Sequence, residues 1–519
     1  MAEAGRTSKR ADASFFLDGW MAPSLLLGLA TLAIHLFVNS GYGFFRDELY
    51  FIVCGNHPAW GYVDQPPLVP LIASWSHALF GNFLVGFRLA PALAMAATVA
   101  LTAEFARMLG GGRFAQWLAG LCALGAGVYL AEGLLITTDL LQPLTWLACG
   151  WFLIRLAQTG DERWWIPFGI VVGISLLSKY MIAFYLLALG TGILATPLRR
   201  SLVRPWFYAG AGIALLMVLP NVLWQWHHGW PFLELGEAAT NGKNVALSPT
   251  AYFVQQLLLV GPLAAPVWLS GLWASTVRPR HAAYRLFPIA YVALFAFFVV
   301  THGKGYYLSA IYPTLLGFGA VAIEGWITST TARTAVLAAV VLVATFLSPI
   351  AVPVLPVGGY IAYARAIGYG PSELAMEHNK IGPLPQVYAD MFGWREMAAK
   401  IAKVYWSLPP QDRARAVFFG NNYGEAAAID VFGRKLGLPP AISGHNNYYL
   451  WGPRGHDGSV VIIIGGSTEH YASLFRSYTV AGRIDNPYAM PYETNKPIYV
   501  LRGMKVPLQT YWPQTKHYE

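Results

Sequence analysis

Long apolar segments recur along the first two thirds of the chain, separated by short polar stretches. A bilayer core about 30 Å thick requires roughly 20 mostly apolar residues per helix. Runs of about this length predict about eleven spanning helices, of which the fifth and sixth are short and closely joined. They cover residues 22–40, 84–106, 114–131, 139–157, 164–178, 180–197, 206–226, 251–275, 286–301, 308–326 and 334–353. The pattern therefore predicts a polytopic α-helical membrane protein.

A different pattern begins after residue 354. Residues 393–407 have helical spacing, and an alanine-rich helix is predicted from Glu425. Short apolar runs typical of buried strands cover residues 415–420, 460–464 and 497–501. Strands that alternate with helices predict a small, mostly parallel sheet. We therefore predict an N-terminal segment (1–21), a membrane domain (22–354) and a soluble α/β domain (355–519).

Composition supports this division of the chain. Only 12% of the 519 residues are charged and 56% are hydrophobic, whereas a soluble domain has about 25% charged residues. Residues 1–354 contain 33 charged side chains, and the 165 residues that follow contain 28. Three cysteines are too few for a disulfide scaffold. The net charge of +9 does not indicate nucleic-acid binding, because the basic residues of the membrane part punctuate apolar runs instead of forming a patch.

The basic residues predict the orientation in the membrane. If the N-terminus is cytoplasmic, loops on the cytoplasmic side contain fourteen of the nineteen Lys and Arg residues before residue 355. Arg6, Lys9 and Arg10 before the first apolar run resemble a signal sequence, but no small-residue cleavage site follows. We therefore predict an uncleaved first span and, after eleven spans, an extracytoplasmic C-terminal domain.

The first extracytoplasmic segment contains three acidic residues. Asp47 and Glu48 follow directly on Arg46, and Asp64 precedes Gln65 and a Pro-Pro pair. Adjacent carboxylates beside a span are suited to accept a proton or to bind a metal ion. The alternative is that Arg46 neutralises one acid while the other is simply solvated. The double proline and the surrounding aromatic residues predict short helices at the membrane surface.

Two further charged residues lie at the predicted extracytoplasmic ends of spans. Asp139 follows two threonines at the start of the fourth span. It is a candidate second acid, or alternatively an N-cap that accepts backbone N–H groups. Lys179 lies between the two short spans. It is a candidate phosphate ligand, or alternatively a lysine whose ammonium reaches out to water.

The turn between the ninth and tenth spans contains His302, Lys304, Tyr306 and Tyr307. An imidazole, an ammonium and two phenols beside glycines suit a phosphate or sugar hydroxyls. The alternative is an aromatic anchor at the membrane interface with a lysine that reaches the head groups.

Other phosphate-binding patterns are absent or ambiguous. The membrane part has neither a Walker-type loop nor a dinucleotide glycine signature, which argues against cytosolic nucleotides as substrates. Asn421-Asn422-Tyr423-Gly424 follows a predicted strand and precedes a helix. We interpret it as a turn and helix cap in preference to an anion site.

The order of these motifs resembles that of the GT-C membrane glycosyltransferases. Asp47-Glu48, then Asp64-Gln65-Pro66-Pro67, then Asp139 at a span entrance carry the resemblance over residues 20–350. The most similar groups are the dolichyl-phosphate-mannose protein mannosyltransferases, the lipid A aminoarabinose transferase and the Rgt-type lipopolysaccharide galacturonosyltransferases. The C-terminal domain resembles the soluble domains of this superfamily in position only.

The resemblance implies transfer of a sugar from a polyprenyl-phosphate-linked donor to a cell-envelope glycolipid or glycan. It implies that Asp47 is the catalytic base, that Glu48 supports it and that Asp139 is a second acid. It further implies donor-phosphate contacts from Lys179, His302 and Lys304, with Asp64, Tyr306 and Tyr307 as substrate-binding residues. The residues suit this chemistry, since a carboxylate activates a hydroxyl and cations stabilise a phosphate leaving group. The expected stereochemical course is inversion.

Several alternatives remain open at the level of sequence. Within the enzymes, the alternative is protein O-mannosyl transfer; outside them, it is a transporter or flippase for a lipid-linked sugar, or a sensor with an external ligand domain. Transporters often contain internal repeats, and we find no convincing repeat here. No cofactor is predicted, and a metal-free mechanism is favoured over a divalent ion held by the acids. The expected location is the bacterial inner membrane.

Overall fold

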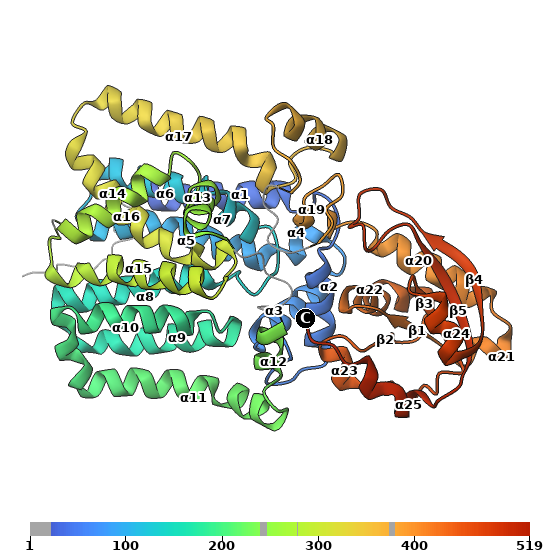
Figure 1. The fold of residues 1–519 in the computed structure, drawn as a ribbon. Coiled ribbons are helices and arrows are strands. Elements are labelled where there is room, and N and C mark those ends of the chain that lie inside the picture. Colours follow the sequence, from blue (N-terminus) through green and yellow to red (C-terminus); the bar gives the residue numbers. More distant parts are fainter. Residues whose placement is uncertain (1–21, 239–246, 278, 373–378) are drawn as a thin grey trace, which may run out of the picture.

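The structure, a computed structural model, describes residues 22–238, 247–277, 279–372 and 379–519. A helical bundle is followed by a smaller domain built around a β-sheet, which lies against one end of the bundle (Figure 1). The predicted fold class, a helical membrane protein with a C-terminal α/β domain, is confirmed. The predicted N-terminal segment and its basic residues lie outside the described residues.

The bundle helices follow the predicted apolar runs. The longer ones are α1 (Ala22–Val38), α5 (Leu89–Met108), α8 (Gln142–Thr159), α11 (Pro205–His227), α15 (Leu286–Val300), α16 (Tyr312–Trp326) and α17 (Thr330–Ala351). The shorter ones are α6 (Arg113–Leu124), α7 (Gly127–Glu132), α9 (Trp165–Ser178), α10 (Ile182–Leu194), α12 (Pro231–Ala238), α13 (Pro249–Val260) and α14 (Ala265–Val277). All of these helices except α12 contribute buried residues to one apolar core, which includes Val99, Trp146, Phe287 and Leu315.

The number of full-length spans is smaller than predicted. Five helical segments among the described residues are long and apolar enough to cross a bilayer, or seven if each bent helix pair counts as one span. The bent pairs are α10 with η3 (Pro197–Val203), at 111°, and α13 with α14, at 113°. The predicted runs all contain helix, but hydropathy does not register the breaks at Pro197 and at Gly261-Pro262, where proline and glycine interrupt the helices. The predicted count of about eleven therefore exceeds the number that meets the length and hydropathy requirement.

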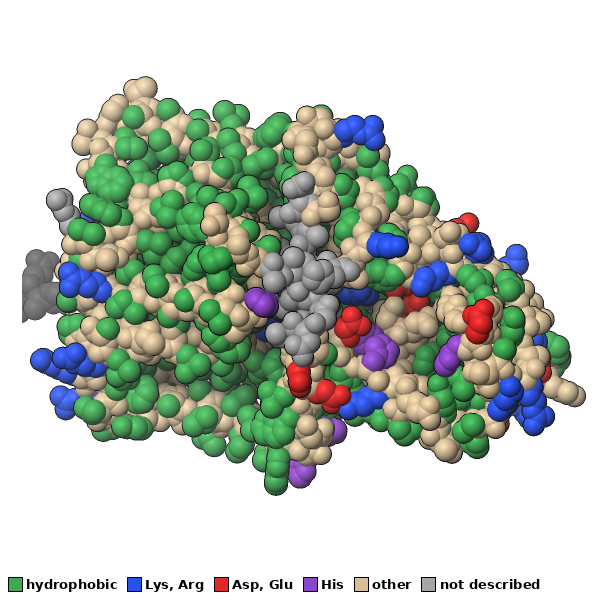
Figure 2. All heavy atoms as spheres, in the orientation of Figure 1, with side chains coloured by type: hydrophobic (Ala, Val, Ile, Leu, Met, Phe, Trp, Pro, Cys, Tyr) green, Lys and Arg blue, Asp and Glu red, His purple; other side chains and the backbone are tan. Residues whose placement is uncertain are grey.

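The basic loops and the C-terminal domain lie at opposite ends of the bundle. Arg280 donates to the carbonyl of Leu109 at the end of α5, and Arg333 donates to the carbonyl of Glu324 near the end of α16. Figure 2 shows Lys and Arg side chains at this end of the bundle, on the left, and further ones on the C-terminal domain, on the right. This relative placement agrees with the predicted sidedness, whereas the orientation in the membrane stays a prediction.

The first loop folds into three short helices next to the C-terminal domain (Figure 1). These are α2 (Arg46–Asn56), α3 (Leu68–Phe80) and α4 (Leu84–Phe87). Helix α3 begins directly after Pro66-Pro67, because proline suits the start of a helix, where its missing N–H is not needed. The prediction that this segment forms short helices is confirmed.

The C-terminal domain contains a five-stranded sheet in the order β2-β1-β3-β5-β4. Its strands are β1 (Ala416–Gly420), β2 (Ile442–Ser443), β3 (Val460–Ile464), β4 (Phe475–Ile484) and β5 (Lys496–Met504). The helices include α18 (Val357–Ala366), α19 (Gln386–Ala389), α20 (Trp394–Ser407), α21 (Pro410–Arg413), α22 (Tyr423–Phe432), α23 (Asn447–Trp451), α24 (Thr468–Leu474) and α25 (Leu508–Tyr511).

The prediction of a mostly parallel sheet is wrong. Strands β1, β2 and β3 are parallel, but β5 pairs antiparallel with both β3 and β4. Strand β4 was missed because the eight consecutive residues between its two ends are not buried, so that it lacks the apolar run of a buried strand. The domain boundaries at residues 21 and 354 stay predictions.

The C-terminal domain contains two buried carboxyl groups that interact with each other. Glu425 and Glu493 are both nearly inaccessible, and Asn422 donates from its amide to Glu493 Oε1 at 2.7 Å. Burial raises the pKa of both carboxyls, and the repulsion from Glu425 raises the pKa of Glu493 further. A carboxyl with a raised pKa stabilises the fold at low pH, and this contribution is lost as the pH rises through the raised pKa.

We expect the free energy of unfolding to decrease as the pH rises above 4.5, the ordinary pKa of a glutamate. The decrease is up to about 1.4 kcal/mol per pH unit for each proton that the folded protein holds and the unfolded chain has lost. Glu493→Gln keeps the shape without the titration, so that the dependence of the melting temperature on pH should become flatter. The exposed Glu396→Gln serves as control. Equal pH slopes for Glu493→Gln and the wild type would contradict this expectation.

Candidate functional site

Asp47 lies in the first turn of α2, at the junction between the bundle and the C-terminal domain. Its Oδ1 accepts a hydrogen bond from Tyr423 Oη at 2.8 Å and lies 3.4 Å from Arg46 Nε. Its side chain is 29% exposed. Among the described residues, no hydrogen bond reaches Oδ2, and Asp47 therefore presents one held oxygen and one oxygen open to a substrate proton.

Arg46 is held by the C-terminal domain as well. Its guanidinium donates to Tyr492 Oη at 2.8 Å, lies 4.0 Å from Asp390 and stands over the ring of Tyr423 at 5.2 Å. The alternative that Arg46 simply neutralises one of the two acids is thus incomplete. Arg46 pairs with Asp47 and also connects α2 to the C-terminal domain.

Glu48 has a different environment from its neighbour. Its side chain is fully buried and pairs with the equally buried Arg88, with distances of 2.9 and 2.8 Å to the two oxygens. The backbone N–H groups of Phe45 and Ile136 donate to the same carboxylate. Four donors occupy both oxygens of Glu48. The sequence could not separate the two adjacent acids, but α2 turns Glu48 into the protein and leaves Asp47 accessible.

Asp64 accepts a hydrogen bond from Tyr50 Oη at 3.0 Å. Tyr50 also accepts from the backbone N–H of Asn447, whose side-chain oxygen binds the backbone N–H of Val63 at 2.7 Å. The loop that contains Asp64 is therefore held between α2 and α23 of the C-terminal domain.

Asp139 and Lys179 form a close ion pair. Lys179 Nζ donates to both carboxylate oxygens of Asp139, at 2.8 and 2.7 Å, and each side chain is 16% exposed. Asp139 precedes α8, whose first residue is Gln142, and no side-chain cap is formed there. The N-cap alternative for Asp139 is thus not supported. Lys179 turns toward this acid, and not outward to water.

The rings of Tyr306 and Tyr307 both lie close to the lysine ammonium. Their ring centres are 5.4 and 5.1 Å from Lys179 Nζ. Both residues belong to η6 (Gly305–Ile311), directly after the turn with His302 and Lys304. His302 is exposed and has a left-handed backbone, with φ of 53°, and Lys304 is half-buried. The structure thus brings the two tyrosines to Lys179, and the predicted roles of His302 and Lys304 stay predictions.

Glu132 is a further acid that the sequence analysis did not select. It lies at the end of α7, accepts a hydrogen bond from Ser309 at 3.1 Å, and interacts electrostatically with Asp139 and Lys179. Its Oε2 is buried with no hydrogen-bond partner among the described residues. The available signal was a carboxylate placed one residue beyond an apolar run, a costly position that itself indicates function.

The loops that contain these two groups of residues are tied together by α11. Tyr180, next to Lys179, donates to Asn221, and the Asn221 amide donates to the carbonyl of Trp60 at 2.8 Å. Gln225 donates to the carbonyl of Tyr62 at 3.0 Å. The loop that contains Asp64 is thus joined to the segment of Lys179 and Asp139, and Tyr50 joins the same loop to α2, which contains Asp47.

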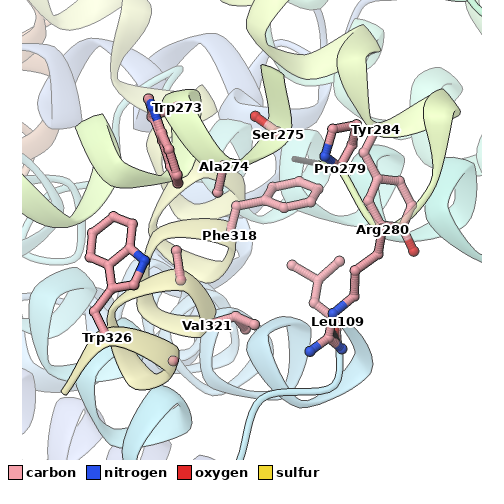
Figure 3. A pocket seen from close by; sticks show the side chains of 12 residues that line it. Leu109, Trp273, Ala274, Ser275, Pro279, Arg280, Tyr284, Phe318, Val321 and Trp326 are labelled. Carbon is pink, nitrogen blue, oxygen red and sulfur yellow. Dashed lines mark hydrogen bonds between the residues drawn. The ribbon is translucent and has the colours of Figure 1, made fainter. Parts of the chain in front are cut away.

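A cavity of about 330 Å³ lies elsewhere, at the end with the basic loops. It is lined by Leu109 after α5, Trp273 of α14, Arg280 and Tyr284 of the segment between α14 and α15, and Phe318 and Trp326 of α16 (Figure 3). No acid lines it, which separates it from the candidate site. Within the described ranges, no three His, Cys, Asp or Glu side chains gather closely enough to hold a metal ion.

Known proteins are similar to this chain in sequence. A family model described as dolichyl-phosphate-mannose-protein mannosyltransferase matches residues 64–224. Lipid A galacturonosyltransferase RgtD of Rhizobium johnstonii is 23% identical over 259 residues, which cover 48% of this chain and 53% of that protein. A polyprenol-phosphate-mannose–protein mannosyltransferase of Corynebacterium glutamicum is 26% identical over 157 residues, covering 25% and 30%. The chain thus spans about half the length of the first relative and less than a third of the second.

Two crystal structures share the overall fold. ArnT from Cupriavidus metallidurans bound to undecaprenyl phosphate has a TM-score of 0.60 at 15% identity, covering 94% of this chain and 98% of ArnT. The apo form of ArnT gives the same score and identity. The fold is therefore that of a membrane protein of the GT-C type. Together with the sequence matches, it supports the resemblance to the GT-C membrane glycosyltransferases that the order of the acidic motifs predicted.

Proposed function

We propose that the protein transfers a sugar from a polyprenyl-phosphate-linked donor to a glycolipid or glycan of the cell envelope. The main support is the placement of Asp47 and the Asp139–Lys179 pair in connected loops at one end of the bundle. The matching fold of ArnT, crystallised with undecaprenyl phosphate, and the similarity to a lipid A galacturonosyltransferase support this donor and acceptor class.

The proposed reaction is a direct displacement with inversion at the anomeric carbon. Asp47 Oδ2 takes the proton of the acceptor hydroxyl while the acceptor oxygen forms a bond to the anomeric carbon. The bond between that carbon and the phosphate oxygen breaks, and its electrons leave with the polyprenyl phosphate. One base and a cationic phosphate site are sufficient for this step, and the proposal needs no metal ion.

The remaining residues have supporting roles in this proposal. Lys179 binds the donor phosphate with the N–H that Asp139 does not use, and Tyr306 and Tyr307 fix its ammonium. His302 and Lys304 add further phosphate contacts. Asp139, Glu132 and Asp64 accept hydrogen bonds from sugar or acceptor hydroxyls. Glu48 is excluded from contact with the substrate by its burial against Arg88.

Lys179→Gln is expected to lower kcat/KM for the lipid donor by about tenfold to hundredfold, because a hydrogen bond to a charged group contributes about 1.5–3 kcal/mol. The KM for the donor should rise, and Lys179→Arg should recover part of the loss. Lys400→Gln is the control, since Lys400 also pairs with an aspartate, Asp485, on the surface of the C-terminal domain. An unchanged donor KM in folded Lys179→Gln would contradict the phosphate role.

We further propose that the protein lies in the bacterial inner membrane with a cytoplasmic N-terminus and an extracytoplasmic C-terminal domain. The gathering of basic loops at the end opposite this domain supports the orientation. Labelling of single cysteines introduced at Arg199 and at Lys403 with a membrane-impermeant reagent tests it. Reaction at position 403 alone in intact cells is expected, and reaction at position 199 alone would reverse the orientation.

The direct test of the function uses purified protein in liposomes with a polyprenyl-phosphate-linked sugar that carries a radiolabel. Transfer of the label to an added lipid A or glycan acceptor is expected. Movement of the labelled lipid across the bilayer without transfer would favour the flippase alternative. Label on protein alone would favour the protein mannosyltransferase alternative, which the similarity to the corynebacterial enzyme supports. Mass spectrometry of surface glycolipids from cells with and without the protein then identifies the sugar and the acceptor.

A further inference from the structure

Helix α2, which contains Asp47, shares a hydrophobic core with the C-terminal domain. Leu49, Tyr50 and Val53 belong to the same buried cluster as Ala398 of α20 and Ala427 of α22. Figure 1 shows α2 directly beside α22, and the two helices are in contact. The orientation of the Asp47 carboxylate therefore depends on a surface that lies almost 400 positions away in the sequence.

Tyr423 is the side chain through which this contact reaches Asp47. It is the first residue of α22, and Asn422 caps the helix by accepting the backbone N–H of Glu425 at 3.0 Å. The cap fixes where Tyr423 begins the helix, and the interpretation of this segment as a turn and cap is confirmed. The phenol donates to Asp47 Oδ1 at 2.8 Å, while the ring stacks on Tyr50 with the centres 4.5 Å apart.

The phenol of Tyr423 remains a hydrogen-bond donor over a wide pH range. Its side chain is almost fully buried, and burial raises its pKa well above 10; the adjacent Asp47 raises it further, although Arg46 opposes the shift. The backbone of Tyr423 is also held, because its N–H donates to His445 Nδ1 at 3.3 Å. Tyr423 is thus rigid, protonated and in direct contact with the proposed base.

We infer that Tyr423 is a positioning residue, through which the C-terminal domain orients Asp47 for proton transfer. The phenol holds Oδ1, so that Oδ2 faces the acceptor hydroxyl. This inference rests on the proposed role of Asp47 as the base. A displacement of a catalytic group by about 1 Å lowers a rate by about a hundredfold. By fixing the position of the Asp47 carboxylate, the C-terminal domain therefore takes a direct part in the reaction.

The experiment compares two tyrosine variants in the full-length protein. Tyr423→Phe is expected to lower kcat by about tenfold to hundredfold and to leave the KM for the lipid donor nearly unchanged, because the phosphate site is separate. Tyr448→Phe is the matched control. Tyr448 is also buried in the C-terminal domain, and its phenol also donates to a carboxylate, Asp430 Oδ2, at 2.9 Å. We expect near-wild-type kcat for this control.

A double-mutant cycle and the replacement of Tyr423 by an unnatural amino acid complete the test. In an Asp47→Asn background, Tyr423→Phe should cause no further loss, because the bond acts through Asp47. Replacement of Tyr423 by 4-aminophenylalanine, which keeps a donor at the same ring position, should restore most of the rate. If Tyr423→Phe does not fold, 4-fluorophenylalanine, which lacks the donor at nearly the same size, takes its place in the comparison.

Three outcomes would overturn the inference. They are wild-type kcat in folded Tyr423→Phe, an equal loss in Tyr448→Phe, and no recovery with 4-aminophenylalanine. The Asp47→Asn protein separates this failure from failure of the proposed function. If Asp47→Asn is inactive while Tyr423→Phe is fully active, only the positioning role is lost. If Asp47→Asn is fully active, the assignment of the base is wrong.

Discussion

Asp47→Asn is expected to lower sugar transfer by a factor of about 10²–10⁴, the contribution typical of general acid–base catalysis, without unfolding the protein. Asparagine keeps the size of the side chain, and its carbonyl oxygen still accepts the Tyr423 hydrogen bond, but it is not able to take the acceptor proton. The measurement is single-turnover consumption of a labelled lipid-linked sugar by purified protein. Size-exclusion chromatography and thermal unfolding show whether the variant is folded.

A matched control for this variant is available in the C-terminal domain. Asp412 has the same side-chain exposure as Asp47, 29%, and it also pairs with an arginine, Arg502, at 2.9 Å. Asp412→Asn should therefore retain wild-type turnover, which shows that loss of a half-buried, paired carboxylate is not itself inactivating. Wild-type turnover in Asp47→Asn would contradict the role of Asp47 as the base.

Arg88→Met is expected to destabilise the protein by about 3–5 kcal/mol, because it leaves the Glu48 carboxylate buried without its charged partner. A domain is stable by only about 5–15 kcal/mol, so this loss removes a large part of the free energy of unfolding. The measurement is the yield of monodisperse protein and its melting temperature in detergent. Glu48→Gln should be destabilising for the same reason, because it leaves Arg88 unpaired.

The control for the fully buried pair is the partly exposed pair of Arg502 and Asp412. Arg502→Met should cost at most about 1 kcal/mol, since solvent screens an exposed ion pair. Adjacent acids thus have opposite expected phenotypes, with loss of activity at Asp47 and loss of folding at Glu48. A Glu48→Gln protein with a wild-type melting temperature and no activity would instead place Glu48 in the reaction.

Sequence patterns predicted the fold class well because the hydrophobic requirement of a bilayer acts on every residue of a span. The same patterns did not register the breaks between helices, since a break such as Gly261-Pro262 lies within an apolar run and bends the chain by 113° without changing its hydropathy. They also misjudged the sheet. Strand β4 pairs with β5, and most of its side chains are exposed. Because its residues do not form an apolar run, a search for buried strands does not find it.

The candidate site was predicted in part. Scarce charges beside apolar runs selected Asp47, Asp139 and Lys179, because an unneeded charge is costly there. The same reasoning could not find Tyr423, which is an ordinary tyrosine at the start of a helix in the C-terminal domain. Its role depends on the 2.8 Å contact with Asp47 across 376 positions, and no local pattern encodes such a contact.

The sequence by itself determined that this chain is a membrane protein, that its last part is not, and which few charges were available for chemistry. Hydropathy and charge are properties of single residues and their near neighbours, and a sequence displays them directly. Only the tertiary structure decided which charges neutralise each other, as Lys179 and Asp139 do, and which are buried out of reach, as Glu48 is. Pairing and burial depend on distances between segments far apart in the chain, and these distances exist only once the helices have packed.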